Sequence, residues 1–145
     1  MINFDNQSNL DIDISILEEI KKLLTAAEVE VIIVEQERMK KLNSLHRGKK
    51  RETDVLSFPL DSSFTPETIA GFPLGSIVIS ATSARQKAKE LGHTIQDEIA
   101  LLFIHGILHL LGFDHEKDNG EMREKEQALI EKFNLPKSLI VRTGE

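Results

Sequence analysis

The chain of 145 residues contains no cysteine, no tryptophan and no tyrosine. Without cysteine it cannot form a disulfide scaffold, a cysteine-ligated zinc ribbon, an iron–sulfur cluster or a thiol nucleophile. With only seven phenylalanines, it is not expected to bind nucleic acid on a platform of many stacked rings. It also lacks a signal-peptide pattern and the roughly 20 consecutive apolar residues of a membrane-spanning helix. We therefore expect a cytoplasmic protein with no membrane partner.

Length and composition indicate a single domain over residues 1–145, because single domains cluster at about 100–150 residues. A hydrophobic content of 40% is enough for one modest aliphatic core. The net charge of −6 at pH 7 argues against non-specific binding to polyanions. Residues 38–51 are an exception, with seven cations and no acid: Arg38, Lys40, Lys41, Arg47, Lys49, Lys50 and Arg51. This basic strip is compatible with directed binding to a polyanion.

Local patterns predict a mixture of strands and helices. Strands are expected at residues 2–4, 29–34, 54–58 and 75–80, and helices at about residues 12–26, 35–45, 81–91, 95–111 and 120–133. Residues 46–52 are predicted to form a basic loop, and residues 60–73 a surface loop. Thr94 begins a capping-box pattern, whereas Gly92 and Gly112 lie where helices should end. The predicted fold class is α/β (α+β), a small mixed β-sheet of about four strands covered by about five helices.

The most informative segment is residues 105–115, which hold three of the five histidines. His105 and His109 are four residues apart on a predicted helix, so their rings stack on one face, with Cβ atoms about 5–6 Å apart. Gly112 can adopt a positive φ and turn the chain, so that His115 could face the first two rings. Three imidazole nitrogens and one open position form the ligand set of a catalytic zinc site. We predict such a site at the end of this central helix.

The spacing of these three histidines around a glycine is also that of the metzincin zinc proteases. Those enzymes carry a glutamate directly after the first histidine as general base, and this chain has Gly106 there. Two other interpretations stay open: histidines that bind no metal, and a structural zinc site closed by Asp114 or Glu116. Either of these carboxylates could instead serve as a base, or Asp114 could orient a ligand histidine.

The histidine segment resembles the signature of the YbeY family, bacterial rRNA maturation factors that are single-strand-specific, metal-dependent endoribonucleases. Two further stretches look like motifs of that family. One is HRGK at residues 46–49 followed by TDVLSFP at residues 53–59, and the other is GSIVIS at residues 75–80. The resemblance runs from about residue 40 to residue 116. The chain departs from it at Ser76, since the family often has aspartate at that point.

The resemblance implies an α/β fold with a small mixed sheet, one zinc ion held by three histidines, and a cleft lined by an arginine. Carried onto this chain, His105, His109 and His115 would be the metal ligands and Arg47 would act on the phosphate. Another divalent transition metal could replace zinc, because imidazole suits several. The implied function is endoribonuclease action in 16S rRNA 3′-end maturation and ribosome quality control. Its partners would be rRNA and ribosomal subunits or ribosome-associated proteins, and not DNA.

Two alternative functions stay open. The first is a metzincin-like metallopeptidase, which has the histidine spacing and lacks the glutamate. The second is a non-enzymatic ribosome-assembly factor with a structural zinc. That factor should unfold when its metal is removed, whereas a catalytic site can lose metal from a folded chain.

Overall fold

The computed structural model describes residues 2–47, 55–59, 73–113 and 119–135. Within them the chain forms four strands and five helices: β1 (Ile2–Asn6), α1 (Ser15–Leu24), β2 (Glu28–Val34), α2 (Gln36–Arg47), β3 (Val55–Pro59), β4 (Pro73–Ser80), α3 (Ala81–Leu91), α4 (Ile95–Leu110) and α5 (Glu121–Phe133). This confirms the predicted fold class of a small mixed sheet covered by helices. In the described part of the chain, no helix is both long enough and apolar enough to cross a membrane.

The four strands form one sheet in the order β1-β2-β4-β3. The first three in this order are parallel to one another, and β3 runs antiparallel to β4 at the edge. Pro59 pairs with Gly75 at the end of β3, a position that an edge strand tolerates because it has only one neighbour.

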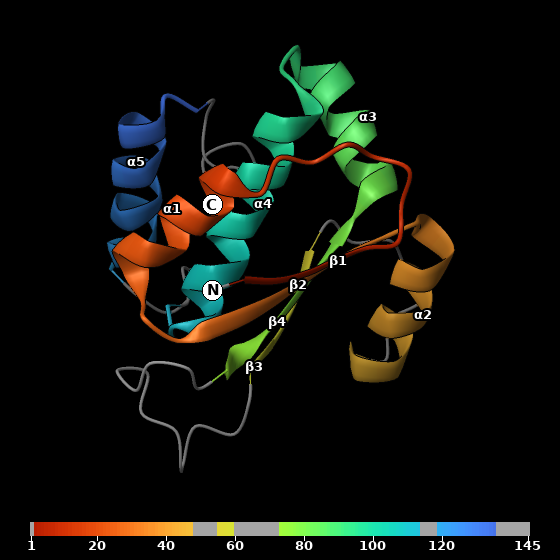
Figure 1. The fold of residues 1–145 in the computed structure, drawn as a ribbon, viewed down its shortest axis with the longest axis horizontal. Coiled ribbons are helices and arrows are strands. Elements are labelled where there is room, and N and C mark those ends of the chain that lie inside the picture. The colour runs from red at the N-terminus through yellow and green to blue at the C-terminus, as the bar shows by residue number, and fades with distance from the viewer. Residues whose placement is uncertain (1, 48–54, 60–72, 114–118, 136–145) are drawn as a thin grey trace.

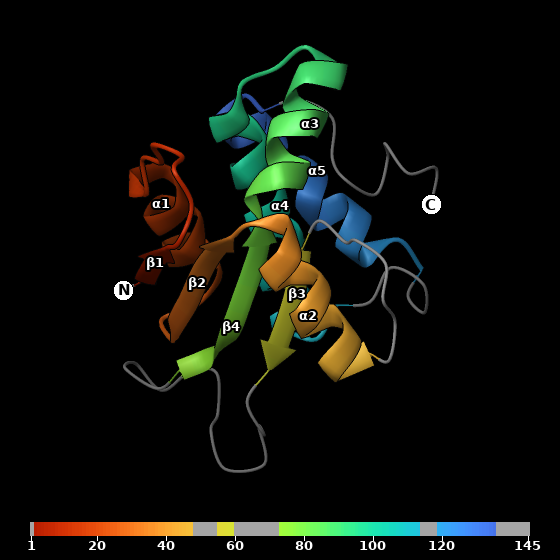
Figure 2. The ribbon, with the colours of Figure 1, turned by 90° about the vertical axis from the view of Figure 1, so that its right-hand side faces the viewer.

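Helices cover both faces of this sheet. Figure 1 shows the sheet nearly edge-on, with α2 on one side and α1, α4 and α5 on the other. In Figure 2, turned by 90°, α2 lies in front of β3 and β4. Helix α4 is central: it packs on β3 and β4 and also contacts α1, α3 and α5. Any site on α4 is therefore supported by most elements of the fold.

Alternation along the strands explains this layering, because successive side chains point to opposite faces of a sheet. Five buried residues of β2 and β4 belong to the main core beneath α4: Val29, Val31, Ile33, Ile77 and Ile79. Residues between them join a smaller cluster with Leu56 and with Met39 of α2: Ile32, Val34 and Val78. Where both faces are buried, the two central strands are continuously apolar, at residues 31–34 of β2 and 77–79 of β4.

Several predicted boundaries were wrong. Strand β1 continues to Asn6 instead of ending at residue 4, β4 begins at Pro73 instead of residue 75, and α1 ends at Leu24 instead of residue 26. Helix α2 continues through Arg47, so residues 46 and 47 belong to the helix and not to the predicted basic loop. No glycine or proline interrupts the helix before Gly48. Helix α1 begins at Ser15 instead of residue 12, because the Asp13 carboxylate accepts hydrogen bonds from the Ser15 N–H (3.0 Å) and hydroxyl (2.7 Å). The rest of the predicted basic loop lies outside the described residues, as do residues 60–72 of the loop predicted at 60–73. The last residue of that predicted loop, Pro73, belongs to β4 instead.

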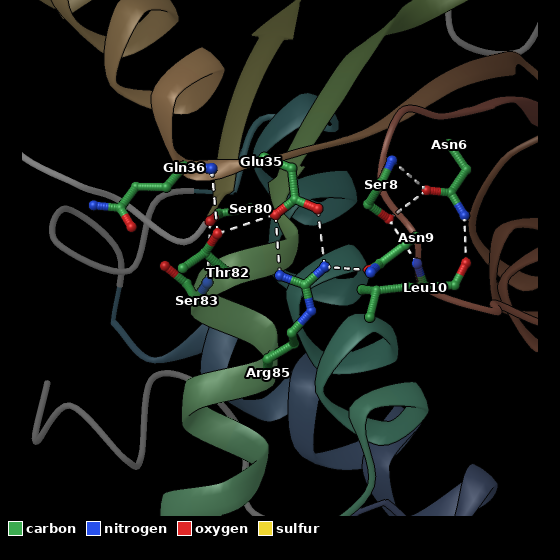
Figure 3. Close-up of polar contacts among 10 residues, drawn as sticks. All are labelled: Asn6, Ser8, Asn9, Leu10, Glu35, Gln36, Ser80, Thr82, Ser83 and Arg85. Carbon is green, nitrogen blue, oxygen red and sulfur yellow. Dashed lines mark hydrogen bonds and ion pairs between the residues drawn. The ribbon is translucent and has the colours of Figure 1, made fainter.

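A polar cluster joins the segments that follow β1 and β2 to the beginning of α3 (Figure 3). Arg85 donates two hydrogen bonds to the Glu35 carboxylate, of 3.0 and 2.9 Å, and a third to Asn9 Oδ1. The Thr82 hydroxyl donates to Glu35 and accepts from the N–H of Gln36 at the beginning of α2, both at 3.2 Å. Hydrogen bonding from Arg85 lowers the pKa of Glu35. The cluster thereby fixes the point at which the chain passes from the end of β2 into α2.

Candidate metal centre

Helix α4 begins and ends as its sequence predicted. The Thr94 hydroxyl accepts the N–H of Asp97 at 3.0 Å. At the other end Gly112 adopts a φ of +100°. Its N–H bonds to the His109 carbonyl and the Phe113 N–H bonds to the Leu108 carbonyl, both at 3.0 Å. These two bonds form a Schellman motif, which folds Phe113 back over the last turn of the helix.

His105 and His109 come together on α4 as their spacing predicted. Their ring centroids are 4.7 Å apart, and the two Nε2 atoms face each other at 3.1 Å. Two imidazole nitrogens that bind the same tetrahedral zinc at about 2.0–2.1 Å lie roughly 3.3 Å from each other. The spacing of these two Nε2 atoms therefore suits a shared metal ion.

The other nitrogen of each ring has an acceptor. His105 Nδ1 lies 2.8 Å from a carboxylate oxygen of Glu126, and His109 Nδ1 lies 3.1 Å from the carbonyl oxygen of Phe113. Because ionised carboxylates and carbonyls only accept hydrogen bonds, both Nδ1 atoms carry the hydrogen, and a neutral ring then has its lone pair at Nε2. Metal-binding histidines are usually held in this way. The donor set thus fits a cation between the two rings.

Glu126 is a site residue that the sequence analysis missed. It comes from α5, and 1% of its side chain is exposed. Its neighbours in sequence that are also buried on α5 are apolar: Met122, Leu129 and Ile130. A glutamate on the apolar face of a predicted helix is rare without a partner. This signal was available, although nothing in the sequence identified His105 as the partner.

The remaining predicted site residues are only partly described. His115, Asp114 and Glu116 lie outside the described residues. Arg47 is the last residue of α2, and its side chain is not described. Among the side chains that are described, no group of three histidine, aspartate or glutamate residues could hold a metal. The third ligand and the cleft arginine therefore stay predictions.

Two of the sequence stretches noted above pack directly on the histidine helix. Ser57, from TDVLSFP, donates its hydroxyl to the Gly106 carbonyl at 3.2 Å. Ile77, from GSIVIS, packs against Gly106. A Cβ atom added to Gly106 would be 2.8 Å from Ile77 Cγ2. A side chain at position 106 would enter the core. The glutamate of the metzincin pattern therefore has no space at this point.

Ser76 lies away from the histidine helix. Its neighbour in sequence, Ile77, faces α4, so Ser76 points to the opposite face of the sheet. There its hydroxyl donates to the Glu30 carboxylate of the neighbouring strand at 2.6 Å. The departure from the family pattern at this position consequently does not alter the surroundings of His105 and His109.

Comparison with known proteins gives consistent matches over nearly the whole chain. A family model described as "Endoribonuclease YbeY" matches residues 3–134. Curated proteins of that name include one from Nautilia profundicola, 55% identical over all of both chains. Another is from Sulfurovum sp. (strain NBC37-1), 54% identical over 98% of this chain and 97% of the relative. The solution structure of TM1509 from Thermotoga maritima is 32% identical, with a TM-score of 0.60 over 91% of this chain and 88% of the other.

Proposed function

The chain belongs to the YbeY family, and we propose that it is a zinc-dependent, single-strand-specific endoribonuclease. In this proposal it acts in the cytoplasm on rRNA of ribosomal subunits, in 16S rRNA 3′-end maturation and ribosome quality control. The observation that carries the metal dependence is the convergence of two histidine Nε2 atoms at 3.1 Å. The endoribonuclease activity follows from the family.

His105, His109 and His115 would hold the zinc ion. When bound, zinc lowers the pKa of a water ligand to about 7 and polarises a phosphoryl oxygen. Glu126 and the Phe113 carbonyl keep the first two rings in the orientation that this requires. The Schellman motif at the end of α4 supports the proposal, because it brings the Phe113 carbonyl within hydrogen-bonding distance of His109 Nδ1.

Arg47 would bind the phosphate at the cleavage position. A guanidinium can donate two parallel hydrogen bonds to phosphate oxygens and stabilise the charge that develops on them in the transition state. Residues on both sides of Arg47 are basic in sequence, which supports an RNA strand as substrate. Their attraction for neighbouring phosphates should weaken as salt concentration rises.

The metallopeptidase alternative receives less support. A peptidase base is expected directly after the first histidine, and at that position Gly106 packs against Ile77. We therefore favour RNA over a peptide as the substrate.

One experiment with a shared sample tests these alternatives. The chain is stripped of metal and reloaded with zinc, then given labelled single-stranded RNA, the same RNA as a duplex, and casein. We expect zinc-dependent cleavage of the single strand only, and its loss in His105→Ala. Casein cleavage would favour the peptidase. Unfolding on metal removal, seen by circular dichroism and without RNA cleavage by the reloaded protein, would favour the assembly factor.

A further inference from the structure

The two histidines of α4 are held by chemically different acceptors. The Phe113 carbonyl that holds His109 is neutral and belongs to the turn that ends the same helix. The Glu126 carboxylate that holds His105 is charged and comes from another helix, 21 residues along the chain. The fold thus places one buried anion directly behind one of the two rings.

We propose that Glu126 is the positioning residue of the metal centre, and that its negative charge, as well as its hydrogen bond, sets the affinity for a divalent cation. This inference rests on the proposed metal-dependent function. Glu126 bonds to His105 Nδ1, the ring nitrogen that does not face His109. It acts through His105, whose Nε2 it directs toward His109.

The burial of Glu126 supports a role for its charge. Only 1% of the Glu126 side chain and 12% of the His105 side chain are exposed. Moving a carboxylate out of water is strongly unfavourable unless it is compensated, and a neutral imidazole offers one hydrogen bond and no charge. Among the described residues His105 is the partner of Glu126, and a divalent cation on the opposite side of the ring would supply positive charge. The three proposed ligands are neutral when they bind metal, so a nearby anion strengthens the site.

The chain contains a matched pair that can serve as a control. His93 Nε2 lies 2.8 Å from the Glu98 carboxylate at the beginning of α4, and the two side chains are 9% and 0% exposed. Glu98 resembles Glu126 in burial and in its histidine partner, but it lies at the other end of the helix. Substituting Glu98 therefore separates the general effect of losing a buried carboxylate from an effect on metal.

The test is a titration of metal-free parent, Glu126→Gln, Glu126→Met and Glu98→Gln with Co²⁺ and Zn²⁺ against a competing chelator. The Co²⁺ absorption spectrum reports the coordination geometry, and circular dichroism verifies that each variant is folded. Glutamine keeps an acceptor oxygen without the charge, whereas methionine has neither. Loss of a group that orients a metal-binding histidine typically weakens binding about 10–100-fold. We expect about 10-fold weaker metal binding for Glu126→Gln and about 100-fold weaker binding for Glu126→Met. Both variants should have an altered Co²⁺ spectrum. Glu98→Gln should bind metal with the affinity of the parent.

Each other result has a definite meaning. Parent affinity in Glu126→Met overturns the inference while leaving the metal-dependent function standing. Parent affinity in Glu126→Gln overturns the part that concerns charge. An equal loss of affinity in Glu98→Gln also overturns the inference, since the effect would then be a general one of buried carboxylates. A parent that binds neither metal overturns both the inference and the proposed metal dependence.

Discussion

Gly106 lies so close to Ile77 that a Cβ added to the glycine would be 2.8 Å from Ile77 Cγ2. Real Cβ atoms essentially never approach other atoms to this distance, so the helix, the strand or the Ile77 side chain would have to shift. The glycine therefore sets how closely the histidine helix packs on β4. The first prediction follows from this contact.

Gly106→Ala should lower the free energy of unfolding although alanine favours helix. The gain in helix propensity is about 1 kcal/mol, whereas overpacking a core typically costs about 1–3 kcal/mol. We expect a net loss of up to about 2 kcal/mol, measured by urea unfolding. The loss should shrink in an Ile77→Leu background, which removes the Cγ2 methyl group. An increased stability in the single variant, or a loss that is as large in the Ile77→Leu background, would contradict the close approach of position 106 to Ile77.

His105→Ala, His109→Ala and His115→Ala should each sharply reduce the zinc content of the purified protein. A site with three protein ligands has no spare ligand to replace the one removed. Elemental analysis after dialysis measures the effect. His93→Ala is the control, because His93 pairs with Glu98 at the far end of α4, and it should retain zinc. Full zinc content in one of the three variants would remove that histidine from the ligand set.

Arg47→Lys should lower the RNA cleavage rate much more than it weakens RNA binding. Lysine keeps the charge but loses the planar pair of donors, and removing one preorganised donor typically costs about 10²–10³ in rate. Single-turnover cleavage and a salt titration of binding measure the two effects. Lys49→Ala should instead weaken binding modestly and flatten its salt dependence. Cleavage by Arg47→Lys at the parent rate would remove Arg47 from the cleft.

Glu35→Gln should reduce stability at neutral pH and have little effect in acid. Hydrogen bonds from Arg85 lower the pKa of Glu35 in the folded chain. The carboxylate therefore stabilises the fold above the unfolded pKa of about 4.3, and this contribution is lost as the pH falls through the folded pKa. The pair is partly exposed, at 34% and 44%, so the effect should be about 1 kcal/mol or less. Urea unfolding of both proteins at pH 7 and pH 3 tests this; an equal difference at both pH values would contradict it.

Ser76→Asp should destabilise the sheet without changing zinc content. The aspartate would replace a hydroxyl that donates to Glu30 at 2.6 Å with a second carboxylate facing the first. Like charges on paired strands are unfavourable, by roughly 0.2–1 kcal/mol. Thermal unfolding and elemental analysis measure the two quantities, and adding Glu30→Gln should restore most of the stability. A loss of zinc would contradict the assignment of Ser76 to the face opposite α4.

Much of the local structure was predictable because short-range patterns decide it. The capping pattern at Thr94 and the glycine at position 112 marked the ends of the histidine helix. The four-residue spacing of His105 and His109 placed both rings on one face, since any α-helix brings residues i and i+4 together. These features depend on residues a few positions apart, so they could be read before the fold was known.

Contacts between distant segments were decided only by the tertiary structure. The sequence could not indicate that Glu126 would meet His105, that Gly106 would face Ile77, or that Ser76 would turn away from the site. Each of these relationships depends on strand order and on which face of the sheet a helix covers. That choice is made by burying apolar surface over the whole chain, and hydrophobic burial is non-directional, so no local pattern specifies the pairs it brings together.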